Sequence, residues 1–434
     1  MGQPSPAIIL FWEPHMPTLP TSPRQAWLNW SISVAFVVLV FGFQTGYAVT
    51  NGKIASSLGL SLADIGLVGS VYTWCFALSQ LLSGSLLDRV GARRVLPIAC
   101  SLLAIGAALV AGAGSLAELL WAQLPLGLGA SFGFISAGFI SGSWFAPQRY
   151  GVMFAWVQFV ASVAAFLSQV TLSRSLAAYP WRAVIYSIAM SGLLLVAVML
   201  LWLRDPPGWE DGYGWPKQPL RFVLHALDDV VGVARTPGMA SNLVIGAVSF
   251  GAMLALGVVW APKLVFGQGI VEEGAHLAAA FCWFGLAFGA PAFAKLSDLV
   301  GSRKKPLLLG VVVELVLLVA LLWGGLGLTW QFSLVFFLFG FVAGASMLSF
   351  IIGCELAGAR RAGTASALVN GSQFVLGGMM MALPGELFGR FGQLELALAV
   401  LPLLVLLVLP LFGWLRETAA PVGVSSFGDA YRNR

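Results

Sequence analysis

The sequence predicts an all-α integral membrane protein with twelve transmembrane helices in two six-helix halves. Hydrophobic residues make up 59% of the 434 residues and charged residues only 9%, whereas a soluble domain carries about 25% charged residues. Apolar stretches of about 20 residues, the length that crosses the hydrocarbon core, recur between short polar breaks. Because these stretches lack the short alternating strands of a membrane barrel, helices are the structure that satisfies their backbone groups.

Twelve apolar stretches divide into two sets of six. The expected spans are 27–50, 62–84, 95–113, 118–143, 151–174, 181–203, 240–262, 276–294, 306–324, 328–353, 363–386 and 395–415. The longest polar break, 204–239, has too many prolines and charges to cross a membrane. We therefore expect an amino-terminal tail at 1–26, a first half at 27–203, a linker at 204–239, a second half at 240–415 and a carboxy-terminal tail at 416–434.

The linker carries one further pattern. Apolar residues recur at helical spacing and two aspartates lie opposite, which predicts a short helix on the membrane surface. The apolar set is Phe222, Val223, Ala226, Leu227, Val230 and Val231. A passive connector is the preferred interpretation over a site for a regulatory partner.

The basic residues report topology and not nucleic-acid binding. Of the 23 lysines and arginines, 18 fall on one side of the twelve expected spans and five on the other. The positive-inside rule then predicts that both termini are cytoplasmic. Residues 1–26 lack the dense basic region of a signal peptide, so we expect a disordered cytoplasmic tail. The four cysteines have no metal-binding or disulfide spacing, and they are interpreted as small buried hydrophobes.

Three landmarks recur at offsets near half the chain length, which predicts two homologous halves. Gly84-Ser-Leu-Leu-Asp88-Arg89-Val-Gly91-Ala-Arg93-Arg94 follows the second span, and Ala294-Lys-Leu-Ser-Asp298-Leu-Val-Gly301-Ser-Arg303-Lys304-Lys305 follows the eighth. Gly129-Ala130-Ser131 recurs as Gly344-Ala345-Ser346, and Arg149-Tyr-Gly151 as Arg361-Ala-Gly363.

The first motif resembles, at every defining position, the loop between helices two and three of the major facilitator superfamily. The second resembles the weaker copy between helices eight and nine, with Ala294 and Leu299 as departures from the pattern. The resemblance covers the whole chain and implies a secondary transporter of the bacterial inner membrane. It says almost nothing about the substrate.

The resemblance also implies that these loops form a conformational latch. Gly84 would allow two helices to approach closely, Gly91 would allow a tight reversal, and Asp88 would meet the positive end of helix eleven, near Gly363. Arg149 would be a second partner of Asp88, and Arg89, Arg93 and Arg94 complete the set. In the second half, the gating candidates are Asp298, Gly301, Arg303, Lys304, Glu355 and Arg361. The alternative is that the basic residues only determine topology.

Polar side chains inside the spans are candidates for substrate binding, because they are costly in hydrocarbon unless they face a cavity or another helix. In the family, the helices that carry most of them line a central cavity. The candidates are Gln44, Tyr47, Trp74, Gln123, Gln158, Trp283, Asn370 and Gln373. For each polar residue, hydrogen bonding between helices without substrate contact is an equally good interpretation, and for the two tryptophans a packing or interfacial position is the better one.

Few charged residues lie within the spans, so few side chains could carry a coupling proton. Glu314 is the one deep acidic residue and Glu386 lies at an outer end; either could carry a coupling proton, although a neutral Glu314 bonded to a neighbouring helix is slightly favoured. Gln123 stands where many proton-coupled members have an arginine. The cavity is thus expected to be nearly neutral, which favours a neutral, zwitterionic or large polar organic solute.

The remaining expectations concern direction and alternatives. The fifth span lacks the glycine and proline of drug exporters, which favours uptake over efflux of a drug, metabolite or metal chelate. A membrane enzyme is disfavoured because Asp228-Asp229 and Glu272-Glu273 have no histidine partner nearby, and a non-transporting sensor stays open. We expect a monomer that uses no cofactor, no metal and no nucleic acid, with a small-molecule substrate, a coupling proton and the lipid bilayer as partners.

Overall fold

The structure is a computed structural model and describes residues 22–145, 147–206, 214–358 and 361–419. Within these ranges, twelve segments are helical, long and apolar enough to cross a membrane, and no strand occurs. The predicted all-α membrane class is therefore confirmed. The expected amino- and carboxy-terminal tails fall largely on residues 1–21 and 420–434, which lie outside the described residues.

In the described chain, seven helices make the first six spans. They are α1 (Pro23–Leu58), α2 (Leu62–Val90), α3 (Ala92–Gly112), α4 (Leu116–Ala130) continued by α5 (Phe132–Trp144), α6 (Pro147–Ala178) and α7 (Trp181–Trp202). The predicted linker helix is α8 (Pro219–Ala234).

The second set of six spans contains more interruptions. It consists of α9 (Met239–Ala255), a π-turn at Leu256–Trp260 and α10 (Ala261–Gly267); α11 (Glu272–Val300); α12 (Lys304–Trp323); α13 (Thr329–Ala343), a 3-10 turn at Gly344–Met347 and α14 (Leu348–Ala357); α15 (Ala362–Phe391); and α16 (Leu394–Leu398), α17 (Val400–Val408) and a 3-10 turn at Leu409–Gly413.

Local signals explain where the first helices begin and end. The Ser22 hydroxyl accepts from the Gln25 amide and Pro23 follows it, as is typical of a helix start. α1 runs past the expected end at residue 50 and stops at Gly59, whose φ of 67° is left-handed. Ser61 and Asp64 then form a reciprocal capping box that starts α2.

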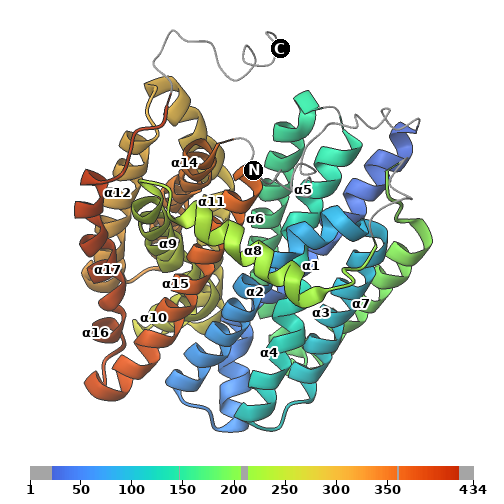
Figure 1. The fold of residues 1–434 in the computed structure, drawn as a ribbon. Helices are drawn as coiled ribbons and strands as arrows, with labels where there is room; N and C mark the ends of the chain where they lie inside the picture. Colours follow the sequence, from blue (N-terminus) through green and yellow to red (C-terminus); the bar gives the residue numbers. More distant parts are fainter. Residues whose placement is uncertain (1–21, 146, 207–213, 359–360, 420–434) are drawn as a thin grey trace.

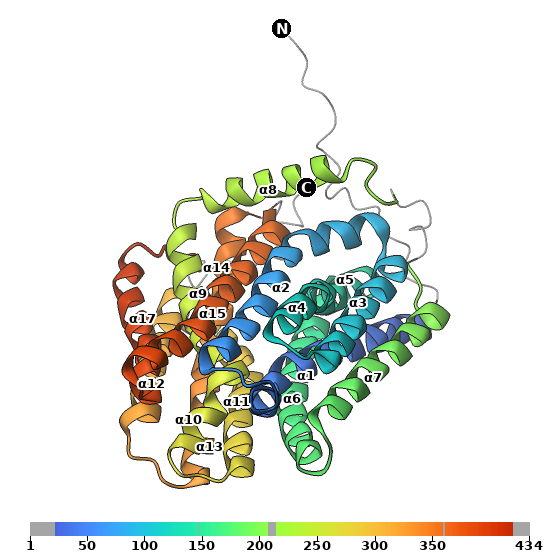
Figure 2. The same ribbon diagram turned by 90° about the horizontal axis from the view of Figure 1, so that it is seen from below.

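The helices form two groups that follow the chain (Figure 1). α1–α7 make one group and α9–α17 the other, and α8 crosses between them. Figure 2 shows α8 along one edge of the molecule, where it packs on α2 and α15. We call this edge the α8 face and the opposite edge the far face. Since successive spans cross in alternate directions, the loops after Val90 and Val300 lie at the α8 face.

The repeated Gly-Ala-Ser motif coincides with a break in each half. α4 gives way to α5 at Ser131, and α13 gives way to α14 through the 3-10 turn that starts at Gly344. A Cβ on Gly129 would come within 2.4 Å of the Ala99 carbonyl oxygen, and a Cβ on Gly344 would come equally close to the Ala290 amide nitrogen. Each glycine therefore lets a broken helix pack directly on the backbone of a neighbouring helix.

Backbone contact is closest where α13 meets α11. A Cβ on Gly340 would lie 1.8 Å from the Cys282 carbonyl oxygen, whereas a Cβ on Gly389 in α15 would meet no atom within 4 Å. We expect Gly340→Ala to lower the free energy of unfolding by about 1–3 kcal/mol, because α11 and α13 must separate, and Gly389→Ala to leave it equal or slightly higher. Thermal unfolding in detergent measures both. Equal stability of the two variants would contradict the α11–α13 packing.

Candidate functional site

Polar and aromatic contacts join the two halves along α2 and α15, which we call the α2–α15 seam. The Trp74 indole N–H donates to the Val375 carbonyl at 3.1 Å. The Asn370 amide donates to the Gln80 side-chain oxygen. Two predicted substrate-binding residues, Trp74 and Asn370, therefore hold the halves together in this structure, which is the interhelical role that the sequence left open.

Three polar pairs join the halves at the far face. They are Lys53 Nζ with Glu272 Oε2 at 3.3 Å, Ser173 Oγ with His276 Nδ1 at 2.8 Å, and Lys263 Nζ with Asn51 Oδ1. Each pair takes one member from α1 or α6 and the other from α10 or α11. We call these pairs the far-face lock, and sequence reasoning missed it because its members look like ordinary loop-end residues.

Gln169 adds a fourth link just inside this lock. Its amide nitrogen donates to the Thr45 carbonyl at 2.9 Å and to the Gly257 carbonyl at 2.8 Å, so it bridges α6, α1 and the π-turn of the second half. Its side-chain oxygen is buried without a partner. The π-turn is the feature that frees the Gly257 carbonyl, since a π-turn breaks the regular ladder of helical hydrogen bonds.

Three predicted substrate-binding residues lie within the first half. Tyr47 and Gln123 line one pocket together with Phe43 and Leu119. The Tyr47 hydroxyl donates to the Ile65 carbonyl at 2.9 Å, and the Gln123 amide donates to the Leu119 carbonyl of its own helix at 2.8 Å. Gln44 is buried with its amide nitrogen unpartnered. This pocket belongs to the first half and not to the space between the halves.

The remaining three predicted binding residues are spread over α6, α11 and α15. Gln158 donates to the Ser162 hydroxyl one turn along α6, at 3.1 Å. Trp283 is 1% exposed and donates to the Gly257 carbonyl at 3.2 Å. Gln373 is fully buried in the second half. The eight predicted residues therefore do not converge on one cavity in this conformation.

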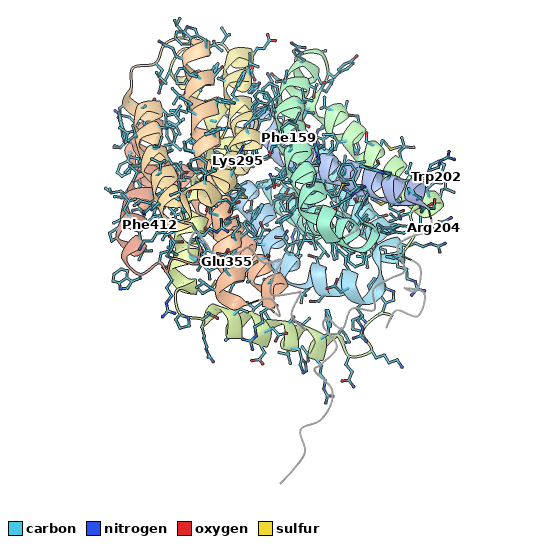
Figure 3. All side chains as sticks on the ribbon, turned by 90° about the horizontal axis from the view of Figure 1, so that it is seen from above. Phe159, Trp202, Arg204, Lys295, Glu355 and Phe412 are labelled. Carbon is cyan, nitrogen blue, oxygen red and sulfur yellow. The ribbon has the colours of Figure 1, made fainter. Side chains whose placement is uncertain are left out.

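Aromatic rings fill the other contact between the halves, where α6 faces α11. Phe159 and Phe288 meet edge-to-face with centroids 5.6 Å apart, and Phe166 and Phe281 lie 5.3 Å apart. Figure 3 shows Phe159 on α6 and Lys295 on α11 in this region. Nearer the α8 face, α5 and α14 do not pack closely on each other in the described chain.

The motif after α2 is only partly assembled. Asp88 is exposed and makes no hydrogen bond or ion pair with any described residue, and Arg149 is likewise exposed. The expected contact of Asp88 with the start of α15 is therefore not made in this conformation. A Cβ on Gly84 would have Ile135 at 3.9 Å as its nearest contact, so the close helix approach expected there is also not made between the described helices.

Asp205 forms a hydrogen bond with the last part of this motif, at Arg93. Asp205 was not identified from the sequence. Its carboxylate accepts from the Arg93 amide at 3.0 Å and so caps the start of α3. Gly91, with φ of 87°, makes room, because a Cβ there would lie 2.6 Å from the carboxylate. Burial raises the pKa of Asp205, although the amides of Arg93 and Ala92 pull in the opposite direction. The tight turn predicted at Gly91 therefore also leaves room for the Asp205 carboxylate to cap α3.

The corresponding motif of the second half is fully bonded. Arg303 pairs with Asp298 at 2.5 Å and with Glu355 at 3.2 Å. Glu355 also accepts from the Thr418 hydroxyl at 2.5 Å. Arg361, another gating candidate of the second half, makes no bond with Glu355. Arg303 is the nearer cation because the loop after α11 turns back at Gly301.

Glu417 occupies the position in the second half that Asp205 occupies in the first. Its carboxylate accepts from the Arg303 amide at 2.8 Å, the Lys304 amide at 3.4 Å and the Ser302 hydroxyl, at the start of α12. Asp205 follows the last span of the first half and Glu417 follows the last span of the second. An acidic residue just after each final span was the available sequence signal.

Both coupling candidates are found in the second half. Glu314 is fully buried in α12 and accepts from the Ser249 hydroxyl of α9 at 2.5 Å. This bond to a neighbouring helix is the arrangement slightly favoured from the sequence. Glu386 is exposed in α15 and has no ion-pair partner among the described residues.

Comparison with known proteins agrees with this architecture. A family model described as the Major Facilitator Superfamily matches residues 32–382. The chain belongs to the major facilitator superfamily. Two solved structures of a bacterial homologue of the human lysosomal transporter Spinster, in inward-facing occupied and unoccupied conformations, superimpose with TM-scores of 0.68 and 0.69. They share 15% and 16% identity and cover 91% and 90% of this chain and 97% of theirs.

Curated superfamily relatives are similar over part of their length. The multidrug resistance protein MdtL of Shewanella oneidensis is 30% identical over 38% of this chain and 43% of its own length. This chain thus matches less than half of that relative. A probable nitrate/nitrite antiporter, NarK1, of Thermus thermophilus is 29% identical over 63% of this chain and 62% of its own. A probable 4-methylmuconolactone transporter of Cupriavidus pinatubonensis is 26% identical over 68% of each.

The Glu417 cap predicts a pH-dependent stability. Burial opposes ionisation of Glu417, but the hydrogen bonds from Ser302, Arg303 and Lys304 outweigh it and lower its pKa. A lowered folded-state pKa adds stability above the unfolded-state value that is lost as the pH falls through the folded-state value. We expect Glu417→Gln to cost about 1 kcal/mol near neutral pH and less in acid, measured as the melting temperature against pH. Glu386→Gln is the control, and a pH-independent loss in Glu417→Gln would contradict the cap.

Proposed function

We propose that this superfamily member is a secondary active transporter that takes up a small polar organic solute or nutrient across the bacterial inner membrane. It works by alternating access and is coupled to a proton. The observation that carries the proposal is the asymmetry between the faces. The far-face lock is closed, whereas Asp88 at the α8 face has no partner among the described residues.

Alternating access follows from exchanging these two sets of bonds. Opening the far face requires the bonds Lys53–Glu272, Ser173–His276 and Lys263–Asn51 to break. Closing the α8 face gives Asp88 its partner at the start of α15, where the N–H groups of a helix end attract an anion. Because new bonds at one face replace those that break at the other, the two states differ by little free energy.

Uncharged amides near the contact between the halves support a polar, uncharged or zwitterionic solute. Gln44 and Gln169 each have a buried amide atom without a partner. Such atoms are costly to leave unsatisfied, so a solute that bonds them on entering between the halves gains free energy. We therefore assign Gln44 and Gln169 to solute contact once the halves part.

Efflux is the second candidate, and two observations favour it. A match at 30% identity, over 38% of the chain, links it to a protein named for multidrug resistance. Exposed aromatic surface at Trp156, which is 53% exposed on α6, would suit a more apolar cargo. Uptake is preferred because α6 lacks glycine and proline over 157–169.

Cross-linking the far-face lock tests alternating access. The 2.8 Å contact between Ser173 Oγ and His276 Nδ1 makes these two positions the pair to replace with cysteines for a cross-link across the far face. We expect the double variant Ser173→Cys, His276→Cys to lose more than tenfold of its solute flux in proteoliposomes on oxidation and to regain it on reduction. Each single variant is a control. Full flux in the oxidised, cross-linked protein would contradict the proposal.

Charge removal at the latch tests the other face. We expect Asp88→Asn to reduce flux about fivefold, because the state closed at the α8 face loses about 1 kcal/mol of helix-end stabilisation. The dissociation constant of the solute for the conformation described here should change less than twofold. Asp229→Asn, which removes an exposed carboxylate of α8, is the control. Unchanged flux in Asp88→Asn would leave Asp88 as a topology determinant only.

A thermal-shift screen of amino acids, nucleosides, sugars and metal chelates identifies the solute, because a ligand of the folded state raises its melting temperature. Hits are then tested for flux with an imposed proton gradient in either direction. Accumulation driven by inward proton flow supports uptake, and accumulation driven by outward flow supports efflux. Binding of a solute without flux in either direction would indicate a sensor and overturn the transporter.

A further inference from the structure

Glu314 lies in the interior of the second half without a counter-charge. Its side chain is 0% exposed; one carboxyl oxygen accepts from Ser249 at 2.5 Å, and the other has no partner. No lysine, arginine or histidine of the described chain pairs with it, and its one hydrogen-bond partner there is Ser249. An ionised carboxylate in this place would cost several kcal/mol, so a bound proton is the natural way to neutralise it.

Other buried oxygens in the same half also lack donors. They are the side-chain oxygens of Asn242, Ser349 and Gln373, each on a residue that is 0% exposed. The amide nitrogen of Asn242 donates to the Ser349 carbonyl at 2.9 Å, and that of Gln373 donates to the Ser346 carbonyl at 3.5 Å. These bonds fix the amide orientations and leave the oxygens free. With the unpaired carboxyl oxygen of Glu314, four buried side-chain oxygens of this half have no hydrogen-bond partner among the described residues.

These groups follow one face of α9. Asn242, Gly246 and Ser249 are spaced by four and three residues and so share a face. A Cβ on Gly246 would fall 2.3 Å from the Ser349 hydroxyl and 3.6 Å from the Gln373 amide nitrogen. Ser349 and Gln373 therefore lie beside Gly246, between Asn242 and Ser249. We call Asn242, Ser349, Gln373 and Ser249 the polar row.

The polar row connects Glu314 with the α8 face. Asn242 lies in the first turn of α9, directly after the connection from α8, and Ser249 is about 10 Å further along the helix axis. The row is enclosed, so an organic solute cannot occupy it. Its unpaired oxygens suit single water molecules as partners, because buried waters characteristically satisfy polar groups that protein atoms leave unpaired.

We propose that Glu314 is the residue that carries the coupling proton and that the polar row, with its waters, conducts this proton between Glu314 and the α8 face. The proposal rests on the proton coupling assigned above. In uptake, the Glu314 carboxylic acid gives its proton to a water of the row, becomes a carboxylate, and the proton leaves at the α8 face. In efflux the same transfer runs in reverse. The ligand of this site is a proton, not a metal ion.

Infrared spectroscopy of the full chain tests the site without any transport. In difference spectra between acid and alkaline pH, we expect a carboxylic acid carbonyl band that is absent in Glu314→Gln and retained in Glu386→Gln. Ser249→Ala keeps the carboxyl group and should shift the band, because the 2.5 Å bond to Ser249 is lost. This second variant keeps the test valid if Glu314→Gln does not fold.

The route is tested by the rate at which the same band shifts after transfer to heavy water. We expect Gln373→Leu and Ser349→Ala to slow this exchange at least tenfold, because they remove the oxygens that hold the waters. Gln123→Leu and Ser136→Ala, which alter buried residues of the first half with bonds inside their own helices, should leave the rate unchanged. Equal rates in all four variants would overturn the route.

Three outcomes separate this inference from the proposed function. A band unaffected by Glu314→Gln overturns the inference even if solute flux is proton-driven. Loss of the band on adding Na⁺ at constant pH and ionic strength also overturns it, since a metal ion would then occupy the site. A band assigned to Glu314 that exchanges through the row supports the site and route, and a failure of flux would then count against transport alone.

Discussion

The antiparallel packing of α2 against α15 is the contact on which the relation between the two halves depends. It begins near the far face, where a Cβ on Gly66 would meet the Met381 carbonyl oxygen at 2.6 Å. It continues through Ser70, whose hydroxyl donates to the Gly378 carbonyl at 2.6 Å, as far as Gln80 and Asn370. Extending this register by two turns brings Asp88 beside the first turn of α15. The seam therefore determines which residues of α15 lie opposite the Asp88 end of α2.

Both halves use the same kind of helix cap beside the motif loop, but the second half has additional ion pairs there. In each, an acidic residue after the sixth span caps the helix that follows the motif loop: Asp205 caps α3 and Glu417 caps α12. The second half adds the ion pairs of Arg303 with Asp298 and Glu355, whereas Asp88 has no such pair in the described chain. The loop after α11 is therefore held by ion pairs that the loop after α2 lacks among the described residues.

Buried polar groups account for much of the internal specificity of a protein whose surface faces hydrocarbon. Apolar packing gives little preference among helix arrangements in a membrane, because lipid is as apolar as leucine. Trp283 and Ser249 each bond to one partner on another helical segment, and Gln169 bonds to two. The π-turn after α9 frees the Gly257 carbonyl, which accepts from both Gln169 and Trp283. Gln169 also keeps one buried side-chain oxygen without a partner.

The sequence alone determined the fold class, the twelve spans, the linker helix and the family, because hydropathy, helix signals and the motif after α2 are local properties. It also singled out Glu314 and the Gly-Ala-Ser repeats that mark the breaks of α5 and α14. Only the tertiary structure showed that Trp74 and Asn370 join the halves and that Gln123 lies inside one half. It also showed that Asp205 caps α3 and that His276 and Lys263 bond across the far face. The physical reason is that a polar side chain in a span must find a partner on another helix, and the partner is set by the register between helices distant in sequence.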